Sequence, residues 1–360
     1  MQTQRFRMTF ALYPNLECLP SSCRELFLGE EELCLSSEWF RNMIANGLPS
    51  NVEARFGVLT AGHTILAVLP LQYCGDYGYG SLTNCYSCIY RPLISMNARA
   101  PDVAWSLGHE LGRLNARWAF SRLDCMPSDW SARQAFSEGL RCAGLEVRRF
   151  DHFGNWYEEI HGRSWEQYLA SRPGHLRELI RRRKRQTDRA AGLRCEIIRR
   201  DEELSRGLDA FERVYARSWK PSEPFPRFNI GVAREAAHIG ALRLGVCWQR
   251  DMPIAVQLWV VRGGVATVLK LAHDESSRGL SPGTVLTAAM IEALIYEGIT
   301  SVDFGRGDDS YKRLWVSQRR QRVGLMLANP RRIKGIARLA RHDLGRLLGP
   351  IRHRNNDYVA

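Results

Sequence analysis

Residues 265–315 read VATVLKLAHDESSRGLSPGTVLTAAMIEALIYEGITSVDFGRGDDSYKRLW, and this stretch decides the fold of the second half of the chain. The apolar run at 265–272 predicts a strand, the apolar spacing of 284–297 predicts a helix, and Val302 with Phe304 marks a second strand. The predicted order is strand, loop, helix, strand, which is a βαβ-like unit. Backbone amides at the start of such a helix meet the positive end of its dipole, so the glycine-bearing loop suits a phosphate or pyrophosphate.

The first half of the chain repeats this order in outline. Before its helix, however, the sequence reads ISMNARAPD and has no glycine that would let a phosphate approach the backbone. We therefore expect an α/β fold with mixed (α+β) sheets in two similar domains, 1–160 and 161–330, of which the first is degenerate, followed by a basic tail at 331–360. The repeated elements are a hairpin (55–73 and 241–261), a helix (102–117 and 284–297) and a strand (118–125 and 301–305).

Periodicity also predicts the elements between these landmarks. Helices are expected at 36–44 (with Ser36 as its cap), 131–143, 164–170, 175–191 and 202–219, strands at 145–150 and 193–199, and a loop at 74–80.

Length and composition indicate a globular chain with room for a large core. The 360 residues are 45% apolar, and no stretch of about 18 uncharged apolar residues occurs, so we expect no transmembrane helix. The N-terminus lacks the apolar run of a secretory signal, which predicts a cytoplasmic protein. The ten cysteines are scattered, and Cys85 and Cys88 form the one CxxC pair. Without a second pair this is weak evidence for zinc or for redox chemistry, so we expect free thiols and no metal.

The net charge of +13 is concentrated in two segments. Residues 171–200 hold eleven Arg or Lys against three acids, and residues 331–354 hold eight against one, so the rest of the chain is nearly neutral. This distribution predicts two local anionic partners rather than a binding surface that covers the whole protein.

The segment 303–315 carries a specific resemblance. It reads Asp303-Phe304-x-Arg306-Gly307-Asp308-x-x-Tyr311-Lys312-x-x-Trp315 and, with the preceding loop and helix, resembles the donor-binding half of GNAT-superfamily N-acyltransferases, in the CelD-type branch related to FemAB aminoacyltransferases. The similarity covers roughly residues 36–330. It implies tandem GNAT-like domains, the first degenerate, that transfer an acyl or aminoacyl group to an amine.

The resemblance places the donor at the loop before the second-half helix. Its residues would be Arg278, Gly279, Ser281, Gly283 and Thr284. The usual loop has Gly where this chain has Ser281, and Pro282 removes one backbone donor. Two acyl donors therefore remain possible. One is acyl-CoA (acetyl-CoA included), and the other, as in the FemAB relatives, is a charged transfer RNA. The alternative reading of the loop is a plain helix start capped by Ser281.

Three residues of the motif are candidates for catalysis. Asp303 leaves its strand on the face opposite Val302 and Phe304 and is either a base or a brace for the turn through Arg306. Asp308 is a base, a substrate anchor, or simply an N-cap or an ion-pair partner of Lys312. Tyr311 lies where related enzymes place a general acid, although it could also pack on Trp315.

Five further residues are expected to bind substrate. They lie in the motif or at the strand end before the donor loop, beside the expected reaction centre. They are His273, Asp274, Arg306, Lys312 and Trp315.

The two basic segments suggest macromolecular or membrane partners. Arg and Lys at 181–185, within the segment 172–194, suit transfer RNA, the 3′-phosphate of coenzyme A, an anionic glycan or lipid headgroups, unless they form a solvated face. The tail at 331–354 has apolar residues at helical spacing with Arg between them. It is either a basic amphipathic helix on an anionic membrane surface or a helix that docks on its own domain.

Together these features predict an N-acyltransferase that moves an acyl group from acyl-CoA to an amine of a sugar, a polysaccharide precursor or an amino-acid-like acceptor. One alternative is an aminoacyl-tRNA-dependent transferase. The other is a non-catalytic membrane-associated partner in envelope or polysaccharide biosynthesis. The expected location is the cytoplasm, with the inner face of the membrane as a peripheral site.

Overall fold

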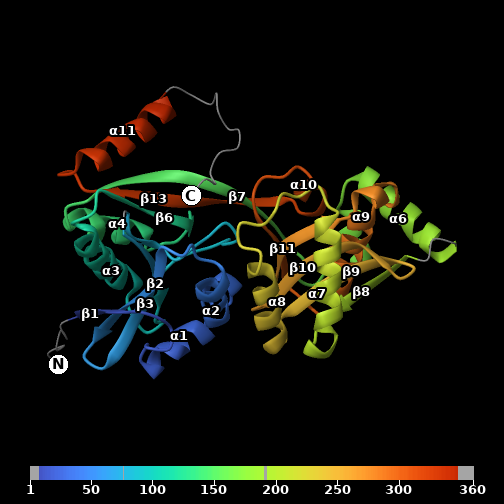
Figure 1. Cartoon of the computed structure of the whole chain (residues 1–360), viewed down its shortest axis with the longest axis horizontal. Helices are drawn as coiled ribbons and strands as arrows, with labels where there is room; N and C mark the ends of the chain where they lie inside the picture. Colours follow the sequence, from blue (N-terminus) through green and yellow to red (C-terminus); the bar gives the residue numbers. More distant parts are fainter. Residues whose placement is uncertain (1–7, 76, 190–192, 348–360) are drawn as a thin grey trace.

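The computed structural model of the chain describes residues 8–75, 77–189 and 193–347, which form two lobes that lie side by side (Figure 1). The elements of the first lobe are β1 (Met8–Tyr13), α1 (Arg24–Leu28), α2 (Ser37–Asn46), β2 (Val52–Ala61), β3 (Thr64–Cys74), β4 (Gly78–Ser81), β5 (Leu93–Ile94), α3 (Ala100–Asn115), β6 (Phe120–Pro127), α4 (Arg133–Cys142) and the long strand β7 (Glu146–Glu159).

The second lobe begins after β7, and the chain then returns to the first. Its elements are α5 (Trp165–Ala170), α6 (Gly174–Arg189), β8 (Leu193–Ile198), α7 (Asp201–Ala216), α8 (Phe228–His238), β9 (Leu242–Gln249), β10 (Met252–Arg262), β11 (Val265–His273), α9 (Pro282–Tyr296), β12 (Ser301–Arg306) and α10 (Lys312–Trp315). The returning elements are β13 (Gln318–Ala328) and α11 (Ile333–Leu347).

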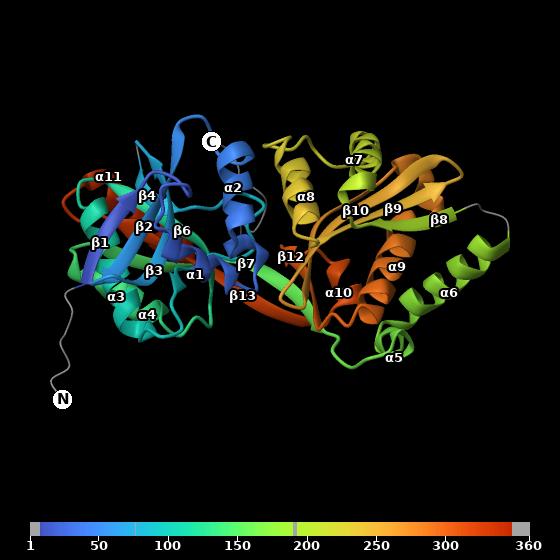
Figure 2. The same cartoon turned by 90° about the horizontal axis from the view of Figure 1, so that it is seen from below.

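Two mixed sheets build the fold. A five-stranded sheet in the first lobe has the order β1-β2-β3-β4, with β5 paired to β3. An eight-stranded sheet runs through both lobes in the order β6-β13-β7-β12-β11-β10-β9-β8. In this sheet β13 pairs antiparallel with β7 from Gln318 opposite Tyr157 to Ala328 opposite Glu146. The strand that follows the second lobe therefore fills the gap between β6 and β7 of the first (Figures 1 and 2).

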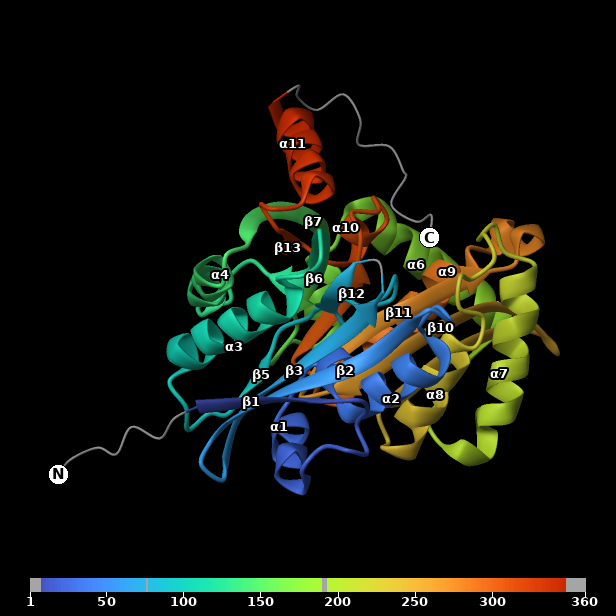
Figure 3. The ribbon, with the colours of Figure 1, turned by 60° about the vertical axis from the view of Figure 1, so that its left-hand side comes forward.

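Helices cover both faces of the sheet in the second lobe. Figure 2 shows α7 and α8 on one side and α9, α5 and α6 on the other. The alternation of β10 explains this arrangement, because Val256, Leu258 and Val260 join the core under α7 and α8 while Trp259 joins the core under α9. In the first lobe α3 and α4 pack on one side and α1 and α2 on the other (Figure 3).

The core under α7 and α8 continues into the first lobe. The ring of Phe228 on α8 packs edge-on against the ring of Trp39 on α2, with centroids 5.2 Å apart. The backbone carbonyl of Phe228 also accepts a hydrogen bond from the side chain of Asn42 (3.0 Å). Because these side chains are buried, apolar packing joins the two lobes in addition to the shared sheet.

A buried ion pair fixes the place where β13 leaves the second lobe. Glu158 on β7 accepts from Arg172 (2.8 Å), and both residues are less than one-tenth exposed. The same carboxylate accepts from the backbone and the hydroxyl of Ser317 (2.7 Å each), and Arg172 also donates to the carbonyl of Trp315 (2.6 Å). The end of α10 is thereby tied to β7.

Most elements expected from the sequence are confirmed. The prediction of a mixed α/β fold is confirmed, as is the βαβ unit, because β11 and β12 pair in parallel around α9. Ser36 caps α2 as expected, accepting from the backbone of Trp39 (3.2 Å). The loop expected at 74–80 is wrong in part, since β4 begins at Gly78 and pairs with β3, and the strand expected at 145–150 extends to Glu159.

The tail forms α11 over its described part, whereas 348–354 lies outside the described residues. In the part of the chain that the structure describes, no helix is long and apolar enough to cross a membrane. The division of the chain at residue 160 stays a prediction.

Candidate active site

The two strands of the βαβ unit separate where the candidate site begins. Their parallel pairing joins Val265, Ala266 and Thr267 to Ser301, Val302 and Asp303 and ends there. Gly305, at φ +63°, follows on β12, and a Cβ at this position would lie 2.9 Å from the carbonyl oxygen of Val268. The donor loop and the motif turn therefore start from the diverging ends of two adjacent strands, which is where α/β sheets usually bind ligands.

The donor loop reaches α9 through a left-handed residue. A 3₁₀ turn at Glu275–Leu280 leads to Ser281, whose φ and ψ are 53° and 45°. Glycine adopts this conformation freely, whereas other residues pay about 1–2 kcal/mol. The chain therefore keeps the backbone of a glycine loop although it carries a serine. The hydroxyl of Ser281 makes no cap hydrogen bond to α9, so the amides of Gly283 and Thr284 in the first turn have no acceptor within the helix.

Arg183 on α6 lies against this loop. Its guanidinium donates to the carbonyl of Gly279 (2.5 Å) and to the hydroxyl of Ser281 (3.3 Å). The other basic side chains of 181–185 on the same helix are exposed, and so is Arg278 on the loop. Arg183 thus brings the basic run of α6 next to the donor loop, a proximity that their separation in the sequence did not reveal.

A buried glutamine anchors the start of α9 to the sheet. Gln257 on β10 donates to the carbonyl of Gly283 (3.1 Å) and to the hydroxyl of Thr287 (2.7 Å), and it accepts from the indole of Trp259 (2.9 Å). Sequence reasoning missed this residue. The available signal was a single amide in a strand whose other central residues are all apolar, because a buried amide needs hydrogen-bond partners.

His273 and Asp274 lie between β11 and the loop. The ring of His273 contacts the ring of Trp219, with centroids 4.5 Å apart, and a Cβ at Gly283 would lie 3.6 Å from Nδ1. Burial lowers the pKa of His273, so its imidazole is neutral at pH 7. Asp274 is buried and accepts from Ser276 (2.9 Å to the backbone) and from Arg217 (3.1 Å). These contacts make Asp274 the cap of the 3₁₀ turn.

Asp303 is buried and fully engaged. One carboxylate oxygen accepts from Asn155 and from the backbone of Gly305 (2.6 Å each), and the other accepts from Arg320 (2.5 Å). The partner is thus Arg320 on β13 and not Arg306. Asn155 in turn accepts from Arg320 (2.6 Å), so β7, β12 and β13 share one buried polar network.

Asp308 occupies a more exposed position, with 44% of its side chain accessible. Its carboxylate accepts two hydrogen bonds from Arg319 (2.7 and 2.9 Å) and one from the indole of Trp156 (2.8 Å). The guanidinium of Arg319 and this indole lower the pKa of Asp308 from 3.8 to about 2. A Cβ at Gly154 would lie 2.2 Å from the carboxylate, so this position on β7 must stay small.

Tyr311 is half-buried and packs beside Phe304, with ring centroids 6.3 Å apart. Burial raises the pKa of Tyr311. No residue in the described part of the chain makes a hydrogen bond with its hydroxyl, which therefore stays available to a ligand. Trp315, by contrast, is buried in the core under α9.

Lys312 and Arg306 support the motif turn. Lys312 is 2% exposed and donates to the carbonyls of Arg306 (2.5 Å) and Gly307 (3.0 Å). Burial lowers the pKa of Lys312, although Asp309 lies 3.4 Å away. Arg306 stacks over Phe153 at 4.5 Å and contacts His152 at 3.1 Å.

A second polar cluster joins the lobes beside β11. Glu223, in the Pro-rich connection before α8, accepts from Lys270 (2.6 Å) and from the hydroxyls of Tyr86 and Tyr215. Lys270 also lies over the ring of Tyr86, 4.8 Å from its centroid. A lysine in an otherwise apolar strand predicts such a partner, because a buried cation without one is costly. Its identity depended on the tertiary fold.

The structure therefore brings the donor loop, His273 and the basic run of α6 together, and it places Asp308 and Tyr311 on the neighbouring turn. The described residues contain no group of three or more His, Cys, Asp or Glu that could hold a metal ion.

The low pKa of Asp308 predicts a pH-dependent contribution to stability. Because the pKa in the folded state, about 2, lies below the value of 3.8, ionised Asp308 stabilises the fold above about pH 4, and this contribution is lost as the pH falls towards 2. In urea, the free energies of unfolding of Asp308→Asn and wild type should differ most at pH 6 and converge near pH 2. The difference should be modest because the ion pair is partly exposed. Asp102→Asn, which disrupts a surface pair with Arg99, is the matched control. A difference that does not change with pH would contradict the assignment.

Comparison with known proteins agrees with this geometry. Residues 174–313 match the model of the acetyltransferase (GNAT) domain family, a range that includes β11, α9 and β12. No curated protein sequence matches the chain.

Several solved structures share the fold over both lobes. FemX has 11% identity and a TM-score of 0.61, with 86% of this chain and 96% of FemX covered. A tandem GNAT protein from the clavulanic acid biosynthesis pathway has 12% identity and a TM-score of 0.51, with 90% and 99% covered. L-PGS from Bacillus licheniformis has 12% identity and a TM-score of 0.51, with 88% and 98% covered.

At these identities the solved structures establish the fold alone, and the family model identifies the domain. The expected tandem GNAT-like architecture and the resemblance to FemAB-related proteins are thereby confirmed. Residues 174–313 of the chain are thus similar to the acetyltransferase (GNAT) domain, and the two lobes together share the fold of FemX and of the tandem GNAT protein.

Proposed function

We propose that this acyltransferase moves an acyl group from acyl-CoA to an amine of a sugar, a polysaccharide precursor or an amino-acid-like acceptor. The observation that carries the proposal is the donor loop. It has a left-handed Ser281, free amides in the first turn of α9, and the guanidinium of Arg183 across it. A pyrophosphate fits such a site because the helix dipole, the amides and the cation all favour negative charge.

The donor loop would hold coenzyme A through Arg278, Gly279, Ser281, Gly283 and Thr284. Pro282 removes one amide from the cradle, and Arg183 supplies a donor on the same side. The exposed cations of α6 then lie within one surface with the loop and suit the 3′-phosphate.

A second donor, aminoacyl-tRNA, is favoured by the width of the basic surface. Five consecutive Arg or Lys at 181–185 carry more positive charge than one coenzyme needs, and a polynucleotide backbone would use it. The likeness to FemX and to L-PGS is compatible with such a donor, but these proteins share only the fold with this chain.

Transfer to an amine needs a base for the nucleophile and an acid for the leaving group. Tyr311 suits the acid, because its hydroxyl is protonated at pH 7 and its ring lies beside β12. Asp308 suits an acceptor anchor better than a base, since a carboxylate with a pKa of about 2 takes up protons poorly at neutral pH. Neutral His273, beside the donor loop, is the base that we favour.

We assign Asp303 the role of bracing the motif turn. Both of its oxygens already accept from buried donors on β7, β12 and β13, so it fixes the turn that presents Asp308 and Tyr311. Arg306, Lys312 and Trp315 support the same turn, and direct contact of these three residues or Asp274 with the acceptor stays a prediction.

The donor is tested first by thermal unfolding with coenzyme A, acetyl-CoA, longer acyl-CoAs and transfer RNA. A donor at about 100 times its Kd should stabilise the fold by about 2.7 kcal/mol. We expect a shift with an acyl-CoA that Arg183→Gln reduces and that the surface control Arg113→Gln leaves unchanged. A salt-sensitive shift with transfer RNA alone would favour the second donor. A wild-type protein that responds to neither would contradict both.

The acid is tested by substitution of a single hydroxyl. Tyr311→Phe should lower kcat by about 10²–10⁴ with little change in thermal stability, because proton donation to the leaving group is lost while the ring still packs. Tyr296→Phe, on a side chain that is 76% exposed at the end of α9, is the matched control. Turnover of Tyr311→Phe within about twofold of wild type would rule out the role.

We further propose that the enzyme works at an anionic membrane surface and contacts it through α11. Leu339 attaches this helix to Phe120 and Ala328 of the first lobe, while Ile333, Ile336 and Leu344 on the other side are 88%, 39% and 57% exposed. With Ala340, these residues form an apolar stripe on the exposed side of the helix, bordered by Ala337, Lys334, Arg338 and Arg341.

Flotation with phosphatidylglycerol vesicles tests the contact. Ile333→Ser with Leu344→Ser should abolish flotation of the intact chain, because the stripe loses its largest exposed apolar side chains. The control is Leu28→Ser with Met96→Ser, which removes two exposed apolar side chains (67% and 99%) outside α11. Equal flotation of both variants and wild type would refute the contact.

A further inference from the structure

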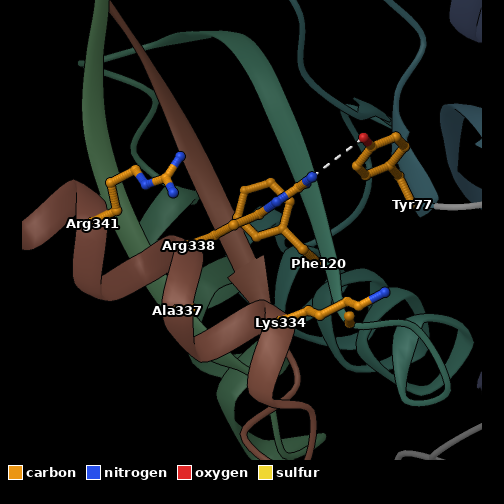
Figure 4. Close-up of a pocket in the computed structure, with 7 residues that line it drawn as sticks. Tyr77, Phe120, Lys334, Ala337, Arg338 and Arg341 are labelled. Atoms are coloured by element: carbon orange, nitrogen blue, oxygen red, sulfur yellow. Dashed lines mark hydrogen bonds between the residues drawn. The ribbon is translucent and has the colours of Figure 1, made fainter.

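A pocket of about 420 Å³ lies between α11 and the first lobe (Figure 4). It is distant from the donor loop, because α11 and α6 lie at opposite ends of the molecule (Figure 1). Its walls combine aromatic rings from the lobe with basic side chains from the helix. The lining residues are Tyr77, Ala119, Phe120, Lys334, Ala337, Arg338 and Arg341.

Arg338 is held in a defined orientation between the two aromatic rings. Its guanidinium lies 4.8 Å from the ring centroid of Tyr77 and 5.0 Å from that of Phe120, and it donates to the hydroxyl of Tyr77 (3.3 Å) (Figure 4). The other N–H groups of this guanidinium make no hydrogen bond with the residues that the structure describes, so they can bind an anion in a bidentate manner. The two rings and the hydroxyl therefore hold this cation in place.

The positive charge of the pocket is not neutralised by the described protein. Within residues 8–75, 77–189 and 193–347, no carboxylate forms an ion pair with Lys334, Arg338 or Arg341. Asp343, the acidic residue of α11, instead pairs with Arg148 on β7 (3.3 Å). Cations spaced three and four residues apart on one helix repel each other, so an anion in the pocket would relieve this repulsion.

The pocket also borders the apolar stripe of α11. Lys334, Arg338 and Arg341 directly follow Ile333, Ala337 and Ala340 in the sequence, so the cationic side and the apolar side of the helix are adjacent. A phospholipid at the surface of a bilayer satisfies both sides, because it carries an anionic phosphate next to hydrocarbon.

We propose that this pocket binds the phosphate of an anionic membrane lipid, with Arg338 as the bidentate ligand and Lys334 and Arg341 completing the positive wall. The proposal rests on the membrane contact of α11 proposed above and adds a specific headgroup site to it. The stripe supplies the hydrophobic attachment, and the pocket makes the attachment selective for anionic headgroups.

The test compares binding to vesicles of phosphatidylglycerol and of phosphatidylcholine by the full chain. Lys334→Gln with Arg341→Gln should weaken binding to phosphatidylglycerol by about 25-fold, at about fivefold for each cation removed at the surface. The same two charges removed from α6, by Arg181→Gln with Arg182→Gln, are the control and should change binding by less than about threefold. The thermal shift caused by the acyl donor should be unchanged in the pocket variant.

A second variant distinguishes a specific headgroup site from nonspecific electrostatic attraction to the vesicle. Arg338→Lys keeps the charge and loses the planar fork, so binding to phosphatidylglycerol should fall about tenfold while the melting temperature stays near that of wild type. Inorganic phosphate at millimolar concentration should not displace the protein from vesicles.

Each result tests a different part of the proposal. Wild-type protein that fails to bind phosphatidylglycerol vesicles overturns the membrane contact and this site with it. Binding that depends on Ile333 and Leu344 but responds equally to the pocket variants and the α6 control leaves the contact standing and overturns the site. Full displacement by inorganic phosphate overturns the lipid as ligand in favour of a soluble phosphate.

Discussion

Glu158 lies at the end of β7 with its side chain almost completely buried, and its carboxylate accepts from Arg172, Arg163 and Ser317. Burial alone would raise the pKa of Glu158, but the hydrogen bonds from Ser317 and the charge of Arg172 hold it below its usual value. A buried carboxylate without partners would cost several kcal/mol, so these contacts must form together.

The segments tied in this way are those that frame the candidate site. Arg172 comes from the connection between α5 and α6, Ser317 from the turn between α10 and β13, and Glu158 from the strand that pairs with β12. Lys312 fixes the other side of the motif turn through the carbonyls of Arg306 and Gly307. The position of Asp308 and Tyr311 therefore depends on charged groups that never contact a substrate.

The sequence predicted the elements whose apolar pattern matches their burial. The strand at 265–272 and the helix at 284–297 were evident because their inward positions are apolar and their ends carry turn residues. β13 was missed because its first half reads QRRQR, which looks like an exposed loop. In the structure Arg320 and Arg322 point to Asn155, and Arg322 is 2% exposed. Buried arginines that pair across a sheet cannot be told from surface arginines by periodicity.

The candidate site was predictable to a similar degree. The motif gave the loop and the turn correctly, because glycines and the change from strand to helix mark them locally. The motif did not predict which residues contact the loop and the two carboxylates. These residues are Arg183 on α6, Asn155 on β7, and Arg319 and Arg320 on β13, all distant in the sequence. The two motif carboxylates illustrate the limit. They are five residues apart, yet Asp303 on β12 is buried among three donors while Asp308 on the turn is partly exposed beside Arg319.

The position of β13 has a consequence for how the protein is made. β6 and β7 leave the ribosome early, but the strand that separates them is synthesised only after the whole second lobe. Multidomain chains commonly complete their N-terminal domain during translation. The first lobe of this protein cannot be completed in that order. The edges of β6 and β7 that pair with β13 stay open until residue 328 has been synthesised. The pairing of β6 with β7 through β13 can therefore be completed only after the second lobe has been synthesised.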